Sequence, residues 1–87
     1  MSEIVKRKIA CLAWFPTESL PFPKLCKIED EDGEIQLIKD IIINGMESIR
    51  DGLYQINEYK CQAIVGKQIR KFKIVYYNKT SEWFIFI

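Results

Sequence analysis

The alternation of apolar and polar residues in Tyr59–Ile87 predicts three β-strands joined by two tight turns. Gly66-Lys67 suits a two-residue type II′ hairpin loop, because the first central position of that turn needs φ > 0. The turn fixes which residues face each other. The expected pairs on one face are Val65/Gln68, Ala63/Arg70, Cys61/Phe72 and Tyr59/Ile74, and those on the other face are Ile64/Ile69, Gln62/Lys71 and Lys60/Lys73. One face is therefore largely apolar, and the other is mostly cationic.

The last strand, Glu82–Ile87, follows a run of turn-forming residues and is apolar on both of its faces. Trp83, Ile85 and Ile87 lie on one face, and Phe84 and Phe86 lie on the other. A single small core covers one face readily, so the second face needs another cover. That cover is either a second copy of the chain or the Pro-rich loop together with residues 44–55.

The N-terminal part reads as one more strand followed by a stiff loop. Ile4–Phe15 is predicted to be a strand, with Ile9, Cys11, Ala13 and Phe15 on one face. Three prolines between residues 16 and 23 exclude a regular ladder and favour an extended loop. Leu20 and Phe22 are expected to pin this loop to the core.

Asp32-Gly33 is a strong hairpin signal between two further strands, Lys24–Asp30 and Glu34–Ile43. A type I′ turn at this dipeptide would place Ile28 opposite Leu37 and Cys26 opposite Lys39. The residues then directed to the core are Cys26, Ile28, Ile35 and Leu37.

Residues 44–55 have the least regular pattern. Met46, Ile49 and Leu53 are spaced i, i+3 and i+7, which favours one short helix near 46–51. We therefore expect an all-β fold of one domain, residues 1–87. It would be a small six-stranded, mainly antiparallel barrel or strongly bent sheet of SH3-like or OB-like size, with that helix as a cap.

The chain has three cysteines without a C-x-x-C spacing, and it has no histidine. These features predict unpaired, buried thiols in a reducing cytoplasm, with no metal and no cofactor. The apolar run after Lys6-Arg7-Lys8 lacks a signal-peptide cleavage site, and no stretch is long enough for a membrane span. The acidic turn around Asp32 lacks oxygen ligands at the first and last places of a calcium loop.

No catalytic constellation is visible. A serine or cysteine nucleophile would need a base other than histidine, and no glycine-rich phosphate loop occurs. We expect the protein not to be an enzyme.

Basic residues gather in residues 59–87 and at Lys6–Lys8, whereas acidic residues gather in residues 18–58. Lys60, Lys71 and Lys73 share the outward face of the C-terminal hairpin, where Lys60 stands opposite Lys73. Like charges in direct opposition cost stability, and a bound phosphate would offset that cost. Tyr77 and Tyr54 are the candidate stacking residues. The alternative is a merely soluble face that resists aggregation.

Four blocks of the sequence resemble a family of short, uncharacterised bacterial proteins. The blocks are Lys8–Phe15, Ile28–Glu34, Tyr59–Gln62 and Trp83-Phe84. The resemblance covers nearly the whole chain in the same order, and Asn44–Leu53 departs from it. It implies a β-strand fold and carries over no activity or site.

The sequence favours a non-enzymatic protein-interaction or self-associating module. The candidate self-association residues are Trp83, Ile85 and Ile87, which would form a symmetric homodimer. The alternative is binding of an anion or a single-stranded nucleic acid through Lys60, Lys71 and Lys73.

Overall fold

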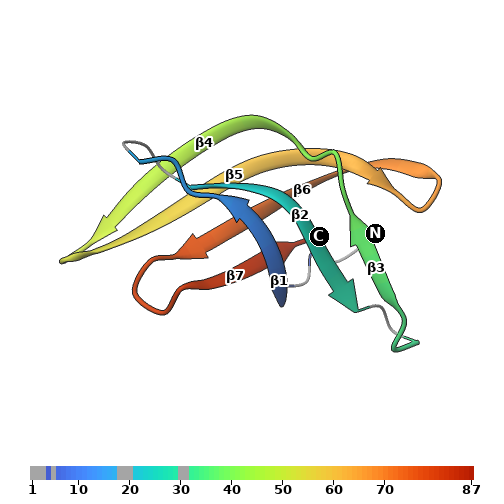
Figure 1. Cartoon of the computed structure of the whole chain (residues 1–87), viewed down its shortest axis with the longest axis horizontal. Coiled ribbons are helices and arrows are strands. Elements are labelled where there is room, and N and C mark those ends of the chain that lie inside the picture. Colours follow the sequence, from blue (N-terminus) through green and yellow to red (C-terminus); the bar gives the residue numbers. More distant parts are fainter. Residues whose placement is uncertain (1–3, 5, 18–20, 30–31) are drawn as a thin grey trace.

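The protein forms one seven-stranded antiparallel sheet in the order β3-β2-β1-β7-β6-β5-β4 (Figure 1). The computed structural model describes residues 4, 6–17, 21–29 and 32–87. The strands are β1 Lys6–Trp14, β2 Phe22–Glu29, β3 Ile35–Ile38, β4 Ile42–Asp51, β5 Tyr54–Val65, β6 Gln68–Tyr77 and β7 Glu82–Phe86. These ranges contain no helix, and hence none that could cross a membrane.

The sheet curls into a half-barrel, as the long bent strands in Figure 1 show. Its two edge strands are β3 and β4, and the curl brings β3 against β5. A strongly twisted sheet of this many strands tends to curl, because the right-handed twist accumulates from strand to strand. The prediction of an all-β, small barrel-like fold is therefore confirmed.

The β5–β6 hairpin has the register expected from its turn. Gly66 has a φ of 68°, and every pair from Val65/Gln68 to Tyr59/Ile74 lies as predicted. The positive φ is available to glycine at little cost, so the turn residue and the strand pattern agree. We call the side of the sheet that carries Tyr59 the inner face, and the opposite side the outer face.

The hairpin between β2 and β3 differs from the expectation by one residue. Ile28 pairs with Gln36 and Cys26 pairs with Ile38, and the paired strands end at Glu29 and begin again at Ile35, further apart than a two-residue turn requires. A slip of one residue moves every side chain of a strand to the opposite face. Ile35 and Leu37 are consequently exposed, contrary to the prediction, whereas Ile38 is fully buried.

The prediction of a helix near 46–51 is wrong. This segment belongs to β4, which pairs with β5 along its whole length. The strand predicted over Glu34–Ile43 ends early, since Asp40 has a φ of 54° and separates β3 from β4. Seven strands therefore replace the expected six. Nine residues of β4 pair with β5, and this ladder forms more backbone hydrogen bonds than a helix of one turn could.

The core lies on the inner face. Tyr59, Ile38, Ile74 and Ile85 have no exposed surface, and Trp83 packs beside Tyr59 and Tyr76. The Tyr59 hydroxyl donates a hydrogen bond to the Pro21 carbonyl, which fixes the end of the Pro-rich loop. Phe22 packs against the core, as expected, whereas Leu20 lies outside the described residues.

Candidate functional site

Lys60, Lys71 and Lys73 all lie on the outer face, on β5 and β6. Lys60 is the direct partner of Lys73, and Lys71 pairs with Gln62. Only Lys73 has an ion-pair partner among the three within the described part of the chain: its Nζ lies 2.9 Å from a carboxylate oxygen of Glu58. The like charges of Lys60 and Lys73 are thus partly balanced by one acidic neighbour.

The three lysines line one shallow depression of about 540 Å³. Asn44, Phe86 and Ile4 contribute to the same lining. The Asn44 side chain is held in place, because its Nδ2 donates a 2.9 Å hydrogen bond to Oε1 of Gln62. We call this feature the lysine depression. It offers cations, an amide and an aromatic ring to a single ligand.

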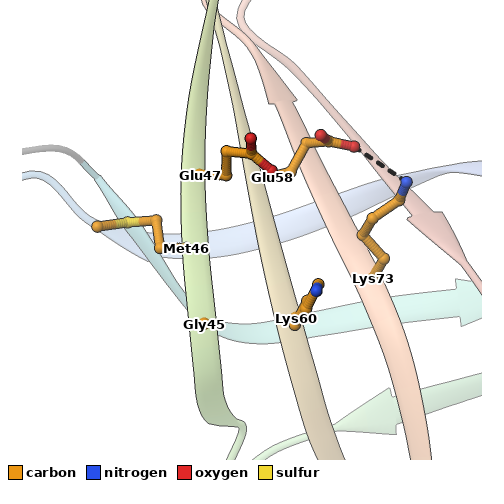
Figure 2. Close-up of a pocket in the computed structure, with 6 residues that line it drawn as sticks. All are labelled: Gly45, Met46, Glu47, Glu58, Lys60 and Lys73. Carbon is orange, nitrogen blue, oxygen red and sulfur yellow. Dashed lines mark ion pairs between the residues drawn. The ribbon is translucent and has the colours of Figure 1, made fainter.

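A second depression, of about 370 Å³, adjoins the first through Lys60 and Lys73. Figure 2 shows that Glu47 and Glu58 project from β4 and β5 on the same side as the lysines, with the ion pair of Glu58 and Lys73 drawn as a dashed line. The two carboxylates make this end of the face unfavourable for an anion. An anionic ligand therefore has its best position over the lysine depression.

One continuous row of residues crosses the sheet at the lysine depression. In strand order β1, β7, β6, β5, β4, its members are Lys6, Phe86, Lys73, Lys60 and Gly45. Neighbouring strands lie about 4.8 Å apart, so Lys6 and Lys60 are separated by about 14 Å. The row places three ammonium groups and one ring along a single line across the sheet.

Aromatic rings extend this row along β6 and β7. Phe84 and Tyr77 make an edge-to-face contact with centroids 5.3 Å apart. The Lys6 ammonium lies 4.5 Å from the Phe84 centroid, 5.1 Å from that of Tyr77 and 5.7 Å from that of Phe86, and it donates a 3.2 Å hydrogen bond to the Tyr77 hydroxyl. Lys73 covers Phe86 at 4.8 Å. We call Tyr77, Phe84 and Phe86 the ring track.

Lys8 lies on the outer face of β1, opposite Phe84. Its Nζ lies 2.6 Å from a carboxylate oxygen of Glu82. The hydrogen bond from Lys8, together with one from Thr80, lowers the pKa of the Glu82 carboxyl. This pair is electrically balanced, in contrast to the lysine depression.

The residues expected to mediate self-association occupy a different place. Trp83 and Ile85 belong to the core, with 7% and 0% exposure, and Ile87 is half-buried against it. The strand β7 has no free edge, because β1 and β6 pair with its two sides. Phe84 and Phe86 are covered in part by Lys6 and Lys73, so the second face is shielded within the chain.

Exposed apolar side chains gather instead at the open side of the half-barrel. Leu37, Ile42, Ile64 and Ile69 are each about half exposed or more, and they line a groove of about 620 Å³ together with Lys39 and Asp40. We call this the seam groove. Its residues come from the two edge strands, from the connection between them and from the β5–β6 hairpin.

All three cysteines have free thiols and point to the inner face. Cys26 and Cys61 are buried as predicted, whereas Cys11, directly opposite Cys26, is half-buried. Burial raises the pKa of Cys26 to about 11 and, with the added effect of the neighbouring thiols, that of Cys11 and Cys61 to about 12. Such thiols stay protonated and unreactive at neutral pH.

No protein-family model, curated protein or solved structure matches this chain. The resemblance to short bacterial proteins therefore stays a prediction. The function must be inferred from the geometry of the site.

Sequence reasoning named the three lysines and Tyr77 but missed Lys6, Asn44, Phe84 and Phe86. Tyr54, the other stacking candidate, lies away from the lysine depression with Lys79 over its ring. Phe84 and Phe86 could have been found from the pattern of Glu82–Ile87. This strand is apolar on both faces, so the apolar side chains of one face had to point outward beside the lysines.

Proposed function

We propose that this protein is a non-enzymatic binding module whose outer face binds the phosphodiester backbone of a single-stranded nucleic acid. The observation that carries the proposal is the meeting of Lys60, Lys71 and Lys73 around one depression with Phe86 and Asn44. Since Lys60 and Lys73 oppose each other directly, a phosphate between them would relieve their repulsion as well as gain their attraction. The three free thiols favour a reducing compartment, and we place the protein in the cytoplasm.

The shape of the face supports a strand that crosses the sheet. Lys6, Lys73 and Lys60 lie along one row, with Lys71 beside them. The carboxylates of Glu47 and Glu58 disfavour paths that would take the bound strand over their end of the face. Small β-barrels use such faces for single strands by combining cations that follow the backbone with aromatic rings.

The test is the salt dependence of oligonucleotide binding, measured by fluorescence anisotropy. Removing one lysine–phosphate interaction should reduce the log–log salt slope by roughly 0.7, so the triple variant Lys60→Gln, Lys71→Gln, Lys73→Gln should lower it by roughly 2 and weaken binding at low salt. The matched control is Lys24→Gln, Lys27→Gln, Lys39→Gln, which removes the same formal charge from exposed positions elsewhere. Undetectable binding by the unmodified protein at low ionic strength, or equal weakening by the control, contradicts the proposal.

A second candidate function, self-association, is favoured by the seam groove. An apolar surface flanked by one cation and one anion, Lys39 and Asp40, is self-complementary across a two-fold axis, so the occupant we propose is a second copy of the chain. Sedimentation equilibrium should then give a dimer that Ile69→Lys converts to a folded monomer. A monomer at high micromolar concentration excludes this candidate.

A further inference from the structure

We infer that the ring track of Tyr77, Phe84 and Phe86 stacks against unpaired bases, so that the outer face takes base-bearing single strands in preference to duplexes or base-free polyanions. The inference rests on the proposed function, because the lysine depression must bring the backbone to this face.

Phe86 is the ring that links the two features. It lines the lysine depression, and in the cross-strand row it stands between Lys6 and Lys73. A nucleotide whose phosphate lies at Lys60 and Lys73 therefore has an aromatic platform one strand away, about 4.8 Å along the row. This spacing lets one nucleotide use both features.

Phe84 and Tyr77 continue the track away from the depression. Their rings are perpendicular, with an interplanar angle of 90°, and together they form a corner that now holds the Lys6 ammonium. A planar base in this corner would stack on one ring and meet the other edge-on. Both arrangements are favourable for aromatic groups.

In the free protein, lysine side chains occupy the positions that bases would take. The ammonium groups of Lys6 and Lys73 lie over the rings at 4.5 to 5.7 Å. A cation over an exposed ring contributes less than a base stacked on it, and the displaced ammonium gains a phosphate partner. Binding thus exchanges the cation–ring contacts of Lys6 and Lys73 for base–ring stacks and for charged hydrogen bonds from these two ammonium groups to phosphate.

The ring track differs from an ordinary solvent-facing aromatic cluster because its rings have a buried neighbour on the same face. Val75, at 3% exposure, lies on the same face, where it is the direct partner of Phe84. The track therefore belongs to a packed layer on a three-strand platform of β1, β7 and β6. Rings fixed in this way are suited to binding, because less side-chain freedom is lost when the ligand stacks.

The experiment compares three labelled ligands of equal length: a single-stranded oligonucleotide of about ten nucleotides, the same phosphodiester chain without bases, and a duplex. We expect the base-bearing single strand to bind about tenfold more tightly than the abasic chain, with the duplex weaker than the single strand. Equal binding of the abasic chain overturns the inference while leaving the proposed function intact. Tighter binding of the duplex overturns the inference and also contradicts the single-stranded ligand of the proposed function. Failure of every ligand to bind defeats the proposed function itself.

Variants locate the effect. Phe86→Leu should weaken binding of the base-bearing strand about tenfold without changing the salt slope. Phe86→Tyr, which keeps an aromatic ring, should bind that strand as tightly as the unmodified protein does. Phe22→Leu is the matched control, because Phe22 is also a half-buried ring under a lysine, Lys24, but lies on β2. An equal loss in Phe22→Leu overturns the inference.

A measurement on the unmodified protein covers the case in which a ring variant fails to fold. The Lys6 ammonium lies within 5.7 Å of three ring centroids, so the NMR signals of the adjacent ε-methylene protons should shift when the base-bearing strand binds and displaces it. Signals that stay in place at saturation overturn the exchange of lysine for base.

Discussion

The two faces of β5, β6 and β7 are made from alternate residues of the same strands, yet they are stabilised in different ways. On the inner face, Tyr59, Ile74 and Ile85 are completely buried. On the outer face, Phe84 and Phe86 remain half-buried beneath the ammonium groups of Lys6 and Lys73, and Lys60 is exposed opposite Lys73. The inner face therefore supplies the stability, whereas the outer face combines rings and like charges in a way that stability alone does not require.

The largest contrast between the faces is expected for a charge introduced on β7. Ile85→Lys buries an unpaired ammonium where no surface is exposed, so the domain should lose more than about 4 kcal/mol and fail to fold. Phe84→Lys, one residue earlier, points outward and should remain folded. Urea denaturation followed by circular dichroism measures both. A folded Ile85→Lys protein would contradict the assignment of the inner face.

Alkaline pH should act on the inner face. The pKa of Cys61 is raised to about 12 in the folded state, so the folded protein binds more protons than the unfolded chain above pH 9. The free energy of unfolding therefore has its largest value below about pH 9 and decreases as the pH rises toward 12. We expect a loss of roughly 2 kcal/mol from Cys61 by pH 11, below the full shift because the folded thiol titrates only near pH 12.

The measurement is urea denaturation at several pH values between 8 and 11. The Cys61→Ala variant is the control, since it should reduce the slope of stability against pH above pH 9. An identical slope in this variant would show that the thiol does not titrate as its burial implies.

Two tyrosine hydroxyls provide a matched pair of smaller changes. Tyr59→Phe leaves the Pro21 carbonyl without its donor beside the core and should cost about 1 to 1.5 kcal/mol. Tyr77→Phe removes a hydrogen bond that Lys6 makes at the surface and should cost less than about 0.5 kcal/mol. Thermal unfolding resolves this difference. Equal losses would mean that the two faces do not differ in solvent access.

The smallest expected effect on stability comes with a large effect on binding. Lys60→Gln removes the charge opposite Lys73 and should leave stability unchanged or raise it by a few tenths of a kcal/mol. Oligonucleotide affinity should fall in the same variant, and the salt slope should drop by roughly 0.7. A loss of stability without loss of binding would assign Lys60 to the fold.

The sequence alone determined the features that depend on short-range chemistry. Gly66 specified its turn, because few other residues adopt its φ, and two residues of loop left one register for β5 and β6. The outward position of Lys60, Lys71 and Lys73 followed from that register. The equally clear signal at Asp32-Gly33 gave the wrong register, since the chain uses a longer connection there and a dipeptide does not reveal loop length.

Only the tertiary structure decided the features that depend on which strands become neighbours. Met46 and Ile49 have helical spacing, but hydrogen bonding to β5 outweighs so weak a local preference. Lys6 and Phe86 are far apart in sequence and meet because β1 pairs with β7. The ring track and the full lysine row therefore exist only once the sheet has formed, because long-range pairing is fixed by burial of the whole inner face and not by any local pattern.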